Sequence, residues 1–507
     1  MTFRAAILLA VLLLSEGVVR AQSKPEPLPS VEAVEEVPPP LAQPLPLPPP
    51  SPGVQAPAAG PSVQAVAEAA KPRGGPLRIA ALQGPGVRDS SDDPSDIENR
   101  IRDLEGLGPA PGTTSAQENR STAAVPDKPT VAWQGELQGD DVMLTQSPGN
   151  KLLLGDLENF SDIRRARLGA IGSLFANTIY RLEFEFAGQG RPTFLDVYGQ
   201  LTDLAYFDNV RIGHFFEPFS IQRLTSNRYQ TFMERPLLDA FAPSRNLGAM
   251  AFSTYADKRG CWQIGIFAAD SNDEAEQQTD RGGLATTGRL TYLPYWDEPS
   301  DGRYYMHLGA DFSYRRPPRQ SVRFGYWPGF RPGSFDNLNW PRWAETGVIS
   351  ADAVQLYDFE WAWVMGPAHV QAEYAVSLVD QRGGPALNFS AWYVEVGFFL
   401  TGESRPYLQE VGIFNRVTPF EPFFFNRTRS GVRAGLGAWQ IAARIDDLNL
   451  NDNNIQGGRL VDATFGLNWH LNPYTRFSFN YVHASLLRGE PGRTYGDLYG
   501  IRAQFEF

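Results

Sequence analysis

The stretch YYMHLGADFSY, residues 304–314, alternates between two kinds of side chain along its whole length. Its apolar positions are Tyr304, Met306, Leu308, Ala310, Phe312 and Tyr314. The polar positions between them include His307, Asp311 and Ser313. Successive side chains of a β-strand point to opposite faces of its sheet, so a period of two residues predicts a strand with one apolar and one polar face.

The same alternation recurs through the last two thirds of the chain. It is clear in TIYRLEFEF (178–186), AHVQAEYAV (368–376) and VDATFGLNWHL (461–471). Such stretches, about ten residues long and bounded by turn residues, are typical of membrane β-strands. A soluble β-sandwich would also alternate. A transmembrane barrel is favoured by charges that recur on the polar faces and by aromatic clusters typical of interfacial girdles, namely Tyr357, Phe359, Trp361 and Trp363.

The connections between the expected strands have two lengths. LNPYTR (471–476) is a tight turn, whereas residues 269–283 and 316–347 are long loops. Short turns at one end and long loops at the other are typical of outer-membrane barrels. The ending DLYGIRAQFEF (497–507) alternates up to Phe507 and is similar to the signal read by the barrel assembly machinery. The expected fold class of residues 161–507 is therefore all-β, a transmembrane antiparallel β-barrel.

The residues before the barrel differ in composition. In residues 1–21, MTFRAAILLAVLLLSEGVVRA, Arg4 precedes a short apolar core, which predicts a cleaved signal peptide and export. Residues 22–130 are rich in Pro, Ala and Gln, which predicts an extended, largely disordered arm with one short helix near 96–105. Residues 131–160 are interpreted as a transition into the barrel.

Composition and motifs argue against several functions. The formal net charge of −12 disfavours nucleic-acid binding, and the single Cys261 allows neither an internal disulfide nor a thiolate metal cluster. There is no HExxH, GxSxG or Walker A motif, so we predict no enzymatic activity, no cofactor and no metal site. Polar faces of the expected strands carry further titratable groups, interpreted as lumen lining with the histidines exposed to water: Glu183, Glu185, Asp358, Glu360, His307, His369 and His470.

One segment interrupts the alternation: HFFEPFSIQRLTSNRYQTFMERP, residues 214–236. It is too apolar for a loop in water and too basic for a core. Folding into the barrel would place its aromatic side chains against the wall and its arginines toward the pore axis. A cation about 4 Å from an anion interacts by about 4 kcal/mol at intermediate dielectric, which is enough to select ions by sign.

The basic residues of the barrel are almost all arginine. Residues 160–507 contain 32 Arg and one Lys, Lys258, against 37 Asp and Glu, which leaves a net charge of −4. Guanidinium is planar and presents a fork of donors that suits phosphate and carboxylate oxyanions. Many of these arginines balance the acidic residues, and those of the interrupting segment are the candidates for an anion site.

These residues resemble a known family, the phosphate-selective porins of the porin O and P family. The resemblance runs from about Ile163 to Phe507 and is carried by RRARLGAIGSLF, IGHFFEPFSIQRLTSNRYQTFMERP, APSRNLGAMAF, TGRLTYLPYWDEPSDGRYYMHLGADFSYR, FFLTGESRPY and YVHASLLRG. It implies a barrel of about sixteen strands in the outer membrane of a Gram-negative-type bacterium. It also implies a homotrimer and a constriction loop that holds the anion site.

The resemblance also implies site residues. The segment RLTSNRYQTFMER would supply cationic and hydroxyl groups at the narrowest point, which makes the expected constriction residues Arg223, Thr225, Ser226 and Arg235, then Arg228 and Arg245, with Asp196 from the preceding strand pair. Phosphate-selective members gather lysines in the lumen, whereas this barrel has only Lys258. Arg223 stands where those members carry Lys, and Phe216 takes a usually basic position. These departures argue against strong phosphate selectivity.

The expected function is passive diffusion of small anions, inorganic phosphate among them, through an Arg-lined constriction of a barrel embedded in outer-membrane lipid. An alternative is a structural envelope protein that tethers the outer membrane through its proline-rich arm. An outer-membrane hydrolase is disfavoured, because the sequence shows no catalytic triad and no metal-ligand spacing.

Overall fold

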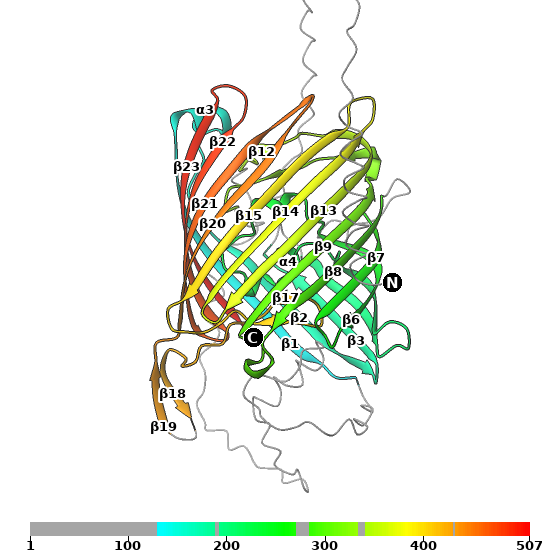
Figure 1. The fold of residues 1–507 in the computed structure, drawn as a ribbon. Helices are drawn as coiled ribbons and strands as arrows, with labels where there is room; N and C mark the ends of the chain where they lie inside the picture. The colour runs from blue at the N-terminus through cyan, green and yellow to red at the C-terminus, as the bar shows by residue number, and fades with distance from the viewer. Residues whose placement is uncertain (1–128, 188–191, 270–282, 333–339, 429–430) are drawn as a thin grey trace, which may run out of the picture. The chain divides into compact units, whose positions relative to one another are not determined.

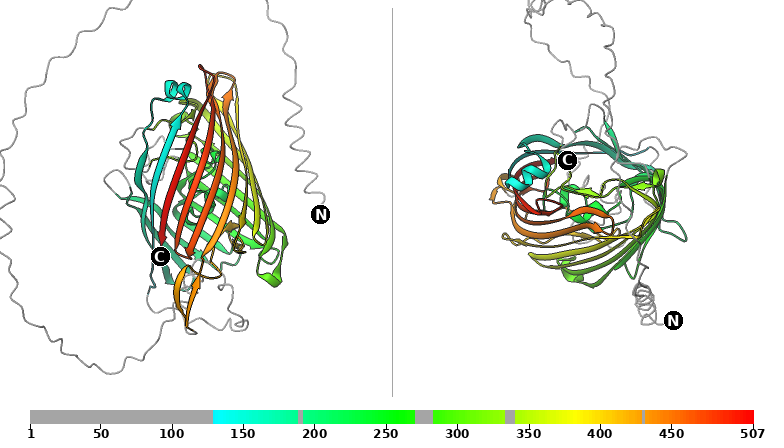
Figure 2. Two further views of the ribbon diagram at one scale, coloured as in Figure 1. Left: turned by 90° about the vertical axis from the view of Figure 1, so that its left-hand side faces the viewer. Right: turned by 90° about the horizontal axis from the view of Figure 1, so that it is seen from above.

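The computed structural model describes residues 129–507 except 188–191, 270–282, 333–339 and 429–430. The predicted signal peptide (1–21), nearly all of the predicted arm (22–130) and the helix near 96–105 lie outside the described residues. Within the described part, sixteen strands form one closed antiparallel barrel (Figures 1 and 2). Each wall strand pairs with the next along the chain, and β23 pairs with β1. The predicted barrel class and strand number are confirmed.

The wall strands follow one another around the barrel in chain order. They are β1 (Ala132–Gln146), β2 (Phe160–Phe175), β3 (Thr178–Glu185), β4 (Thr193–Thr202), β5 (Asn209–Phe216), β6 (Arg245–Tyr255), β7 (Gly260–Ala268), β8 (Leu284–Trp296), β9 (Tyr304–Arg316), β13 (Ile349–Met365), β14 (Ala368–Gln381), β15 (Leu387–Phe399), β20 (Ala438–Asp452), β21 (Ile455–Asn472), β22 (Thr475–Leu487) and β23 (Arg493–Glu506).

Shorter elements lie in the connections. The helical turns are α3 (Pro148–Leu154), α4 (Ile221–Leu224), η2 (Asn227–Tyr229), η3 (Leu237–Ala240), η4 (Glu298–Ser300) and η5 (Pro318–Gln320). The short strands are β10 (Ser321–Val322), β11 (Gly325–Tyr326), β12 (Ala344–Glu345), β16 (Tyr407–Leu408), β17 (Ile413–Phe414), β18 (Phe424–Thr428) and β19 (Gly431–Gly435). No helix in the described ranges combines the length and the apolar character needed to cross a membrane.

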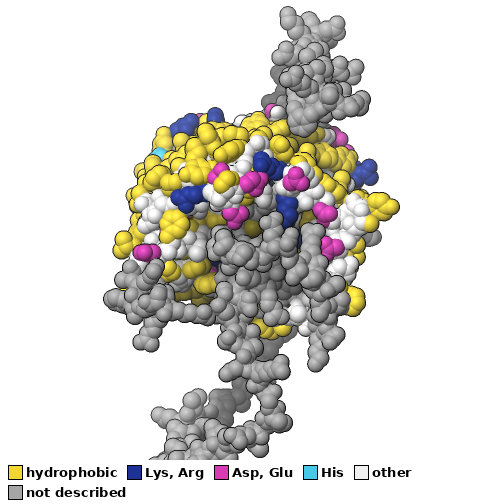
Figure 3. Space-filling model, turned by 60° about the horizontal axis from the view of Figure 1, so that its bottom comes forward, with side chains coloured by type: hydrophobic (Ala, Val, Ile, Leu, Met, Phe, Trp, Pro, Cys, Tyr) yellow, Lys and Arg dark blue, Asp and Glu magenta, His cyan; other side chains and the backbone are white. Residues whose placement is uncertain are grey.

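Alternation decides which side chains face outward. On β9, Leu308 and Phe312 are exposed, whereas His307, Asp311 and Ser313 are buried in the interior. Hydrophobic side chains cover the outer wall, and charged side chains gather at the barrel end that faces the viewer in Figure 3. Lipid can solvate the apolar wall, while the closed ladder pairs the backbone polar groups that lipid cannot solvate.

The barrel begins earlier in the chain than expected. β1 is a full wall strand inside residues 131–160, the range predicted as a transition. Its outward positions include Gly135, Gly139 and Asp141, which interrupt the apolar face that marks the other strands. A Cβ at Gly135 would lie 2.3 Å from the ring of Phe507, so this glycine makes room for the end of the last strand. The glycine at position 135 is therefore explained by the packing of Phe507 and not by hydrophobic alternation.

The connections differ in length at the barrel end where β1 starts and β23 finishes. Most are short there, as at residues 176–177, 366–367 and 473–474. Residues 400–437, between β15 and β20, instead form a long insertion at this end, and the β18–β19 hairpin projects from it in Figure 1. The expectation of short turns throughout this end is therefore wrong at one connection.

The segment predicted to fold inward does so. Residues 217–244 cross the lumen, where Phe219, Met233 and Leu238 join the main buried apolar cluster of the barrel. The backbone N–H of Met233 donates to Asn480 Oδ1 on β22 at 2.8 Å, and that of Leu237 donates to Asp446 Oδ1 on β20 at 3.2 Å. Both acceptors lie on the wall opposite β5 and β6, so the segment spans the interior.

The lumen is consequently more tightly filled than expected. His307, His369 and His470, predicted to be exposed to water, are at most 8% exposed. Their positions on the inward faces are as predicted, but inward-folded chain covers them. Alternation determines the face of a strand and carries no information about what packs against that face.

Closure of the barrel brings together a buried ion pair that can be tested. Arg502 on β23 donates to both carboxylate oxygens of Asp140 on β1, each at 2.7 Å, and to Glu234 Oε1 at 2.7 Å. We expect Arg502→Ala to lower the free energy of unfolding by about 3–5 kcal/mol, because Asp140 stays buried without its cation. Urea titration of the folded barrel, followed by tryptophan fluorescence, measures the loss.

The matched control is Arg382→Ala. Arg382 pairs with Asp352 at 2.7 Å, but both side chains are about half exposed, so its loss should cost about 1 kcal/mol or less. Equal losses for the two variants would show that the Arg502 pair does not stabilise closure.

Candidate functional site

The interrupting segment brings three guanidinium groups around one aromatic ring. Phe216 ends β5, and Arg245 begins β6 with its guanidinium carbon 3.9 Å from the Phe216 ring centroid. The guanidinium carbons of Arg223 and Arg235 each lie 5.8 Å from the same centroid. The negative face of an aromatic ring attracts cations. The ring of Phe216 therefore lies close to three guanidinium cations.

Arg235 and Arg223 also brace the fold of the inward segment. Arg235 donates to the carbonyl oxygens of Gln222 and Arg223, both at 3.1 Å, and Arg223 donates to that of Ala242 at 2.7 Å. Burial lowers the pKa of Arg235 to about 10, with Asp239 opposing the shift and Arg223 adding to it. Arg235 therefore remains a cation at neutral pH.

Arg245 is oriented by acidic groups of the wall. Its Nε donates to Asp196 Oδ1 on β4 at 2.8 Å, and its Nη2 lies 3.9 Å from Glu183 Oε2 on β3. Arg181 Nε lies 3.5 Å from the second oxygen of Asp196. Asp196 thus stands between two guanidinium groups and fixes their geometry.

Phe216, Arg235, Arg245 and Asp196 border a cavity of about 220 Å³ between the inward segment and β2–β6. Its basic lining consists of Arg167, Arg181, Arg211, Arg228, Arg235 and Arg245. Its acidic lining consists of Glu183 and Asp196. Guanidinium groups outnumber carboxylates in this lining, whereas the barrel as a whole is slightly acidic.

The structure separates the predicted constriction residues into two groups. Those that line the cavity are Asp196, Ser226, Arg228, Arg235 and Arg245. Arg223 and Thr225 are absent from its lining. Thr225 is buried, and its hydroxyl accepts a hydrogen bond from the backbone N–H of Phe414 at 3.4 Å. Its hydroxyl therefore joins two chain segments.

Three lining arginines come from the wall and were not predicted as site residues. Arg167, Arg181 and Arg211 project inward from β2, β3 and β5. Arg211 donates twice to Gln200 Oε1, at 3.0 and 2.8 Å, and its guanidinium carbon lies 4.2 Å from the Tyr198 ring centroid. Among the described residues, no carboxylate oxygen lies within 4.0 Å of it. In the sequence, the recurrence of Arg on the polar faces of adjacent strands could have indicated these three residues.

A second inward segment, residues 403–417 of the β15–β20 connection, was also not predicted. Its hairpin β16–β17 packs against β7–β9: Arg289 donates to the carbonyls of Val411 and Gly412 at 3.0 and 2.8 Å, and Tyr305 donates to that of Arg405 at 3.0 Å. Leu408, Val411, Ile413, Phe414 and Asn415 close one side of the cavity. Like the first segment, it lacks the alternation of the strands on either side of it, but this break alone does not show that a connection lies inside the barrel.

The chain is similar to several known proteins. The family model of the phosphate-selective porin O and P matches residues 131–507. A Caulobacter vibrioides protein named "Uncharacterized protein" is 30% identical over 399 residues, 74% of this chain and 76% of its own. Porin O of Pseudomonas aeruginosa is 24% identical over 398 residues, 70% of this chain and 83% of its own. The solved Vibrio cholerae outer-membrane protein OmpTΔL8 is 11% identical, with 75% of this chain and all of that chain covered and a TM-score of 0.48.

The attachment of the second inward segment can be tested at Arg405. Its Nη1 donates to Gln371 at 2.7 Å and to Glu395 at 2.9 Å, and its guanidinium carbon lies 3.6 Å from the Phe414 ring centroid. We expect Arg405→Gln to speed amide hydrogen exchange in residues 403–417 about tenfold or more, because a buried charged contact is lost. Hydrogen exchange followed by mass spectrometry resolves that segment.

Lys258→Gln is the control, since Lys258 pairs with Glu410 of the same segment at 2.8 Å but is exposed. It should leave the exchange rates nearly unchanged. Unchanged exchange in Arg405→Gln would mean that this contact does not hold the segment in place.

Proposed function

The chain belongs to the phosphate-selective porin O and P family and is an outer-membrane porin, and from this premise we propose that small anions, phosphate among them, cross it through the arginine-lined cavity. We propose further that it works as a homotrimer in outer-membrane lipid. The observation that carries the proposal is the lining of the cavity, where six arginines face two carboxylates.

The arrangement supports both capture and release of an anion. Neighbouring guanidinium groups raise the local concentration of anions and replace part of their hydration shell. Each cation about 4 Å from the ion contributes about 4 kcal/mol at intermediate dielectric, before the cost of dehydration. Glu183 and Asp196 offset part of that attraction, so the ion can leave as well as enter.

The chemistry of the lining favours oxyanions. Planar guanidinium forks match the paired oxygens of phosphate, sulfate or carboxylate better than a Lys ammonium does. Arg235 and Arg245 are held in place by backbone carbonyls, Asp196 and the Phe216 ring. Rigid donors hold an oxyanion longer than mobile lysines, so this pore favours oxyanions in general and passes them slowly.

The double variant Arg235→Gln/Arg245→Gln tests the proposal in planar lipid bilayers. Reversal potentials in a KCl gradient should show a chloride-over-potassium preference about tenfold lower, because two of the six lining cations are gone. Block of the chloride current by added phosphate should weaken by a similar factor. Arg382→Gln, which removes an exposed Arg on the β14–β15 turn, is the control and should change neither quantity.

A change of the opposite sign provides a second test. Asp196→Asn removes a carboxylate that neutralises Arg245 and Arg181, so anion preference and phosphate block should both increase. Wild-type protein that folds but gives no conductance steps would overturn the porin function. Conductance with reversal potentials unaffected by all three cavity substitutions would overturn the assignment of this cavity.

A further inference from the structure

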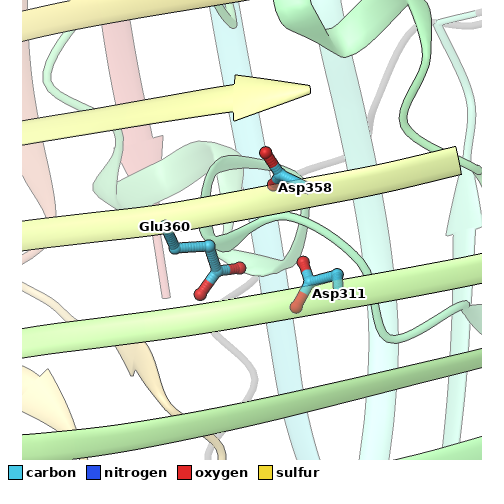
Figure 4. A group of neighbouring side chains, drawn as sticks. All are labelled: Asp311, Asp358 and Glu360. Atoms are coloured by element: carbon cyan, nitrogen blue, oxygen red, sulfur yellow. The ribbon is translucent and has the colours of Figure 1, made fainter. Parts of the chain in front are cut away.

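Four carboxyl groups meet on the inner wall on the side of the barrel formed by β9, β13 and β14. Asp358 and Glu360 are two residues apart on β13 and share its inward face. Asp311 on β9 is the direct cross-strand partner of Asp358, and Glu373 on β14 is that of Glu360. Figure 4 shows the carboxylates of Asp311, Asp358 and Glu360 grouped on two adjacent strands. One carboxylate oxygen from each of these three lies within 4.8 Å of the others.

The partners of these groups leave several oxygens free. Glu360 is satisfied by Arg289, at 2.9 and 2.7 Å, and by His307 at 2.8 Å. Within the described residues, neither carboxylate oxygen of Asp358 has a hydrogen-bond partner, although Asp358 is fully buried. Asp311 Oδ1 also lacks a hydrogen-bond partner among the described residues, and so does Glu373 Oε2. Four buried acceptor atoms are therefore available to a proton or to a bound cation.

Electrostatics makes such a cluster unfavourable by itself. Like charges directly opposite each other on neighbouring strands repel, and a buried carboxylate without a partner costs several kcal/mol. Arg289 lies next to Glu360 and, at 3.6 Å, next to Asp311 Oδ1. One guanidinium cannot neutralise four carboxylates, so the cluster must take up either protons or a further cation.

We propose that Asp311, Asp358 and Glu360, with Glu373 on the neighbouring strand, bind a divalent hard cation, and that this cation is Ca²⁺. Carboxylate oxygens are the ligands that Ca²⁺ and Mg²⁺ prefer. Ca²⁺ fits better because it accepts irregular sets of mono- and bidentate carboxylates, whereas Mg²⁺ demands near-octahedral geometry and keeps its waters. A Cβ at Gly309 would lie 2.1 Å from Glu360 Oε2, so a glycine leaves room for the carboxylate at this place.

The cation would connect the wall to the start of the inward segment. The backbone N–H of Ser220 donates to Asp311 Oδ2 at 2.6 Å, and that of Gln222 donates to Glu373 Oε1 at 3.2 Å. Tyr393 on β15 donates to the same Glu373 oxygen at 2.5 Å. Neutralising the cluster keeps these carboxylates in place as acceptors, and the metal therefore stabilises the inward fold of residues 217–244.

This site is independent of the proposed anion passage. None of its four carboxyl residues lines the arginine-rich cavity. Loss of anion selectivity would leave the calcium site standing, and loss of calcium binding would leave the anion proposal standing.

Equilibrium dialysis of the full-length folded barrel tests the inference. Protein in detergent is freed of metal with a chelator and dialysed against Ca²⁺, and one bound Ca²⁺ per chain is expected. Asp358→Asn should weaken binding at least tenfold, because it replaces one charged ligand by a neutral amide. Asp352→Asn is the matched control on the same strand, where Asp352 is exposed and pairs with Arg382, and it should bind as wild type does.

Thermal unfolding supplies a second readout. Ca²⁺ should raise the Tm of the wild type and of Asp352→Asn but not that of Asp358→Asn. If Asp358→Asn fails to fold, Glu373→Gln is measured in its place. The site would be overturned if the wild-type protein binds no Ca²⁺ and its Tm does not change. It would also be overturned if Asp358→Asn is more stable than the wild type in chelator and Ca²⁺ raises the Tm of both proteins equally. Tighter binding of Mg²⁺ than of Ca²⁺ would overturn the choice of metal.

Discussion

Inside a bilayer no water is available to the backbone, so each N–H and C=O of the wall must pair with a neighbouring strand. The pairing of β1 with β23 closes the ring and removes both edges that an open sheet would leave. Closure then assigns faces, because alternate residues of each strand point to lipid or to the lumen. The apolar outer wall and the concentration of charge inside both follow from this constraint.

The closed wall directs polar side chains from all sixteen strands into one interior, which two chain segments then fill. Residues 217–244 enter after β5 and residues 403–417 enter from the β15–β20 connection. They meet where Thr225 accepts from the Phe414 N–H and border the same cavity. Buried charge is tolerable there because guanidinium groups pair with carboxylates, and Arg binds carboxylate more rigidly than Lys does.

Charge is distributed unevenly in the interior. Arginines of β2, β3, β5 and β6 face the cavity on one side, whereas carboxylates of β9, β13 and β14 gather on the other. The first inward segment contacts both groups: Arg228 and Arg235 line the cavity, and Ser220 binds Asp311. A cation held by the acidic cluster would therefore stabilise the segment that shapes the anion cavity. Net charge, which is slightly negative for the barrel, does not show this distribution.

Much of the architecture could be predicted from local pattern. Alternation in residues such as 304–314 predicted the strands and their faces, and its interruption at 214–236 predicted an inward segment. β1 escaped prediction because Gly135 serves the packing of Phe507 rather than an apolar face. Residues 403–417 escaped because a break in alternation does not say whether a connection lies outside or inside the barrel.

The amino-acid sequence by itself determined the barrel, because the period of two and the apolar outward face depend only on residues near each other in the chain. It also determined that the cations would be guanidinium groups. Only the tertiary structure decided which of them share a cavity: Arg211 and Arg167 join it, whereas Arg223 and Thr225 hold chain segments together. The tertiary structure alone also brought together Asp311, Asp358 and Glu373, which come from three different strands. Closing the barrel sets such distances between residues far apart in sequence, and no local spacing records them.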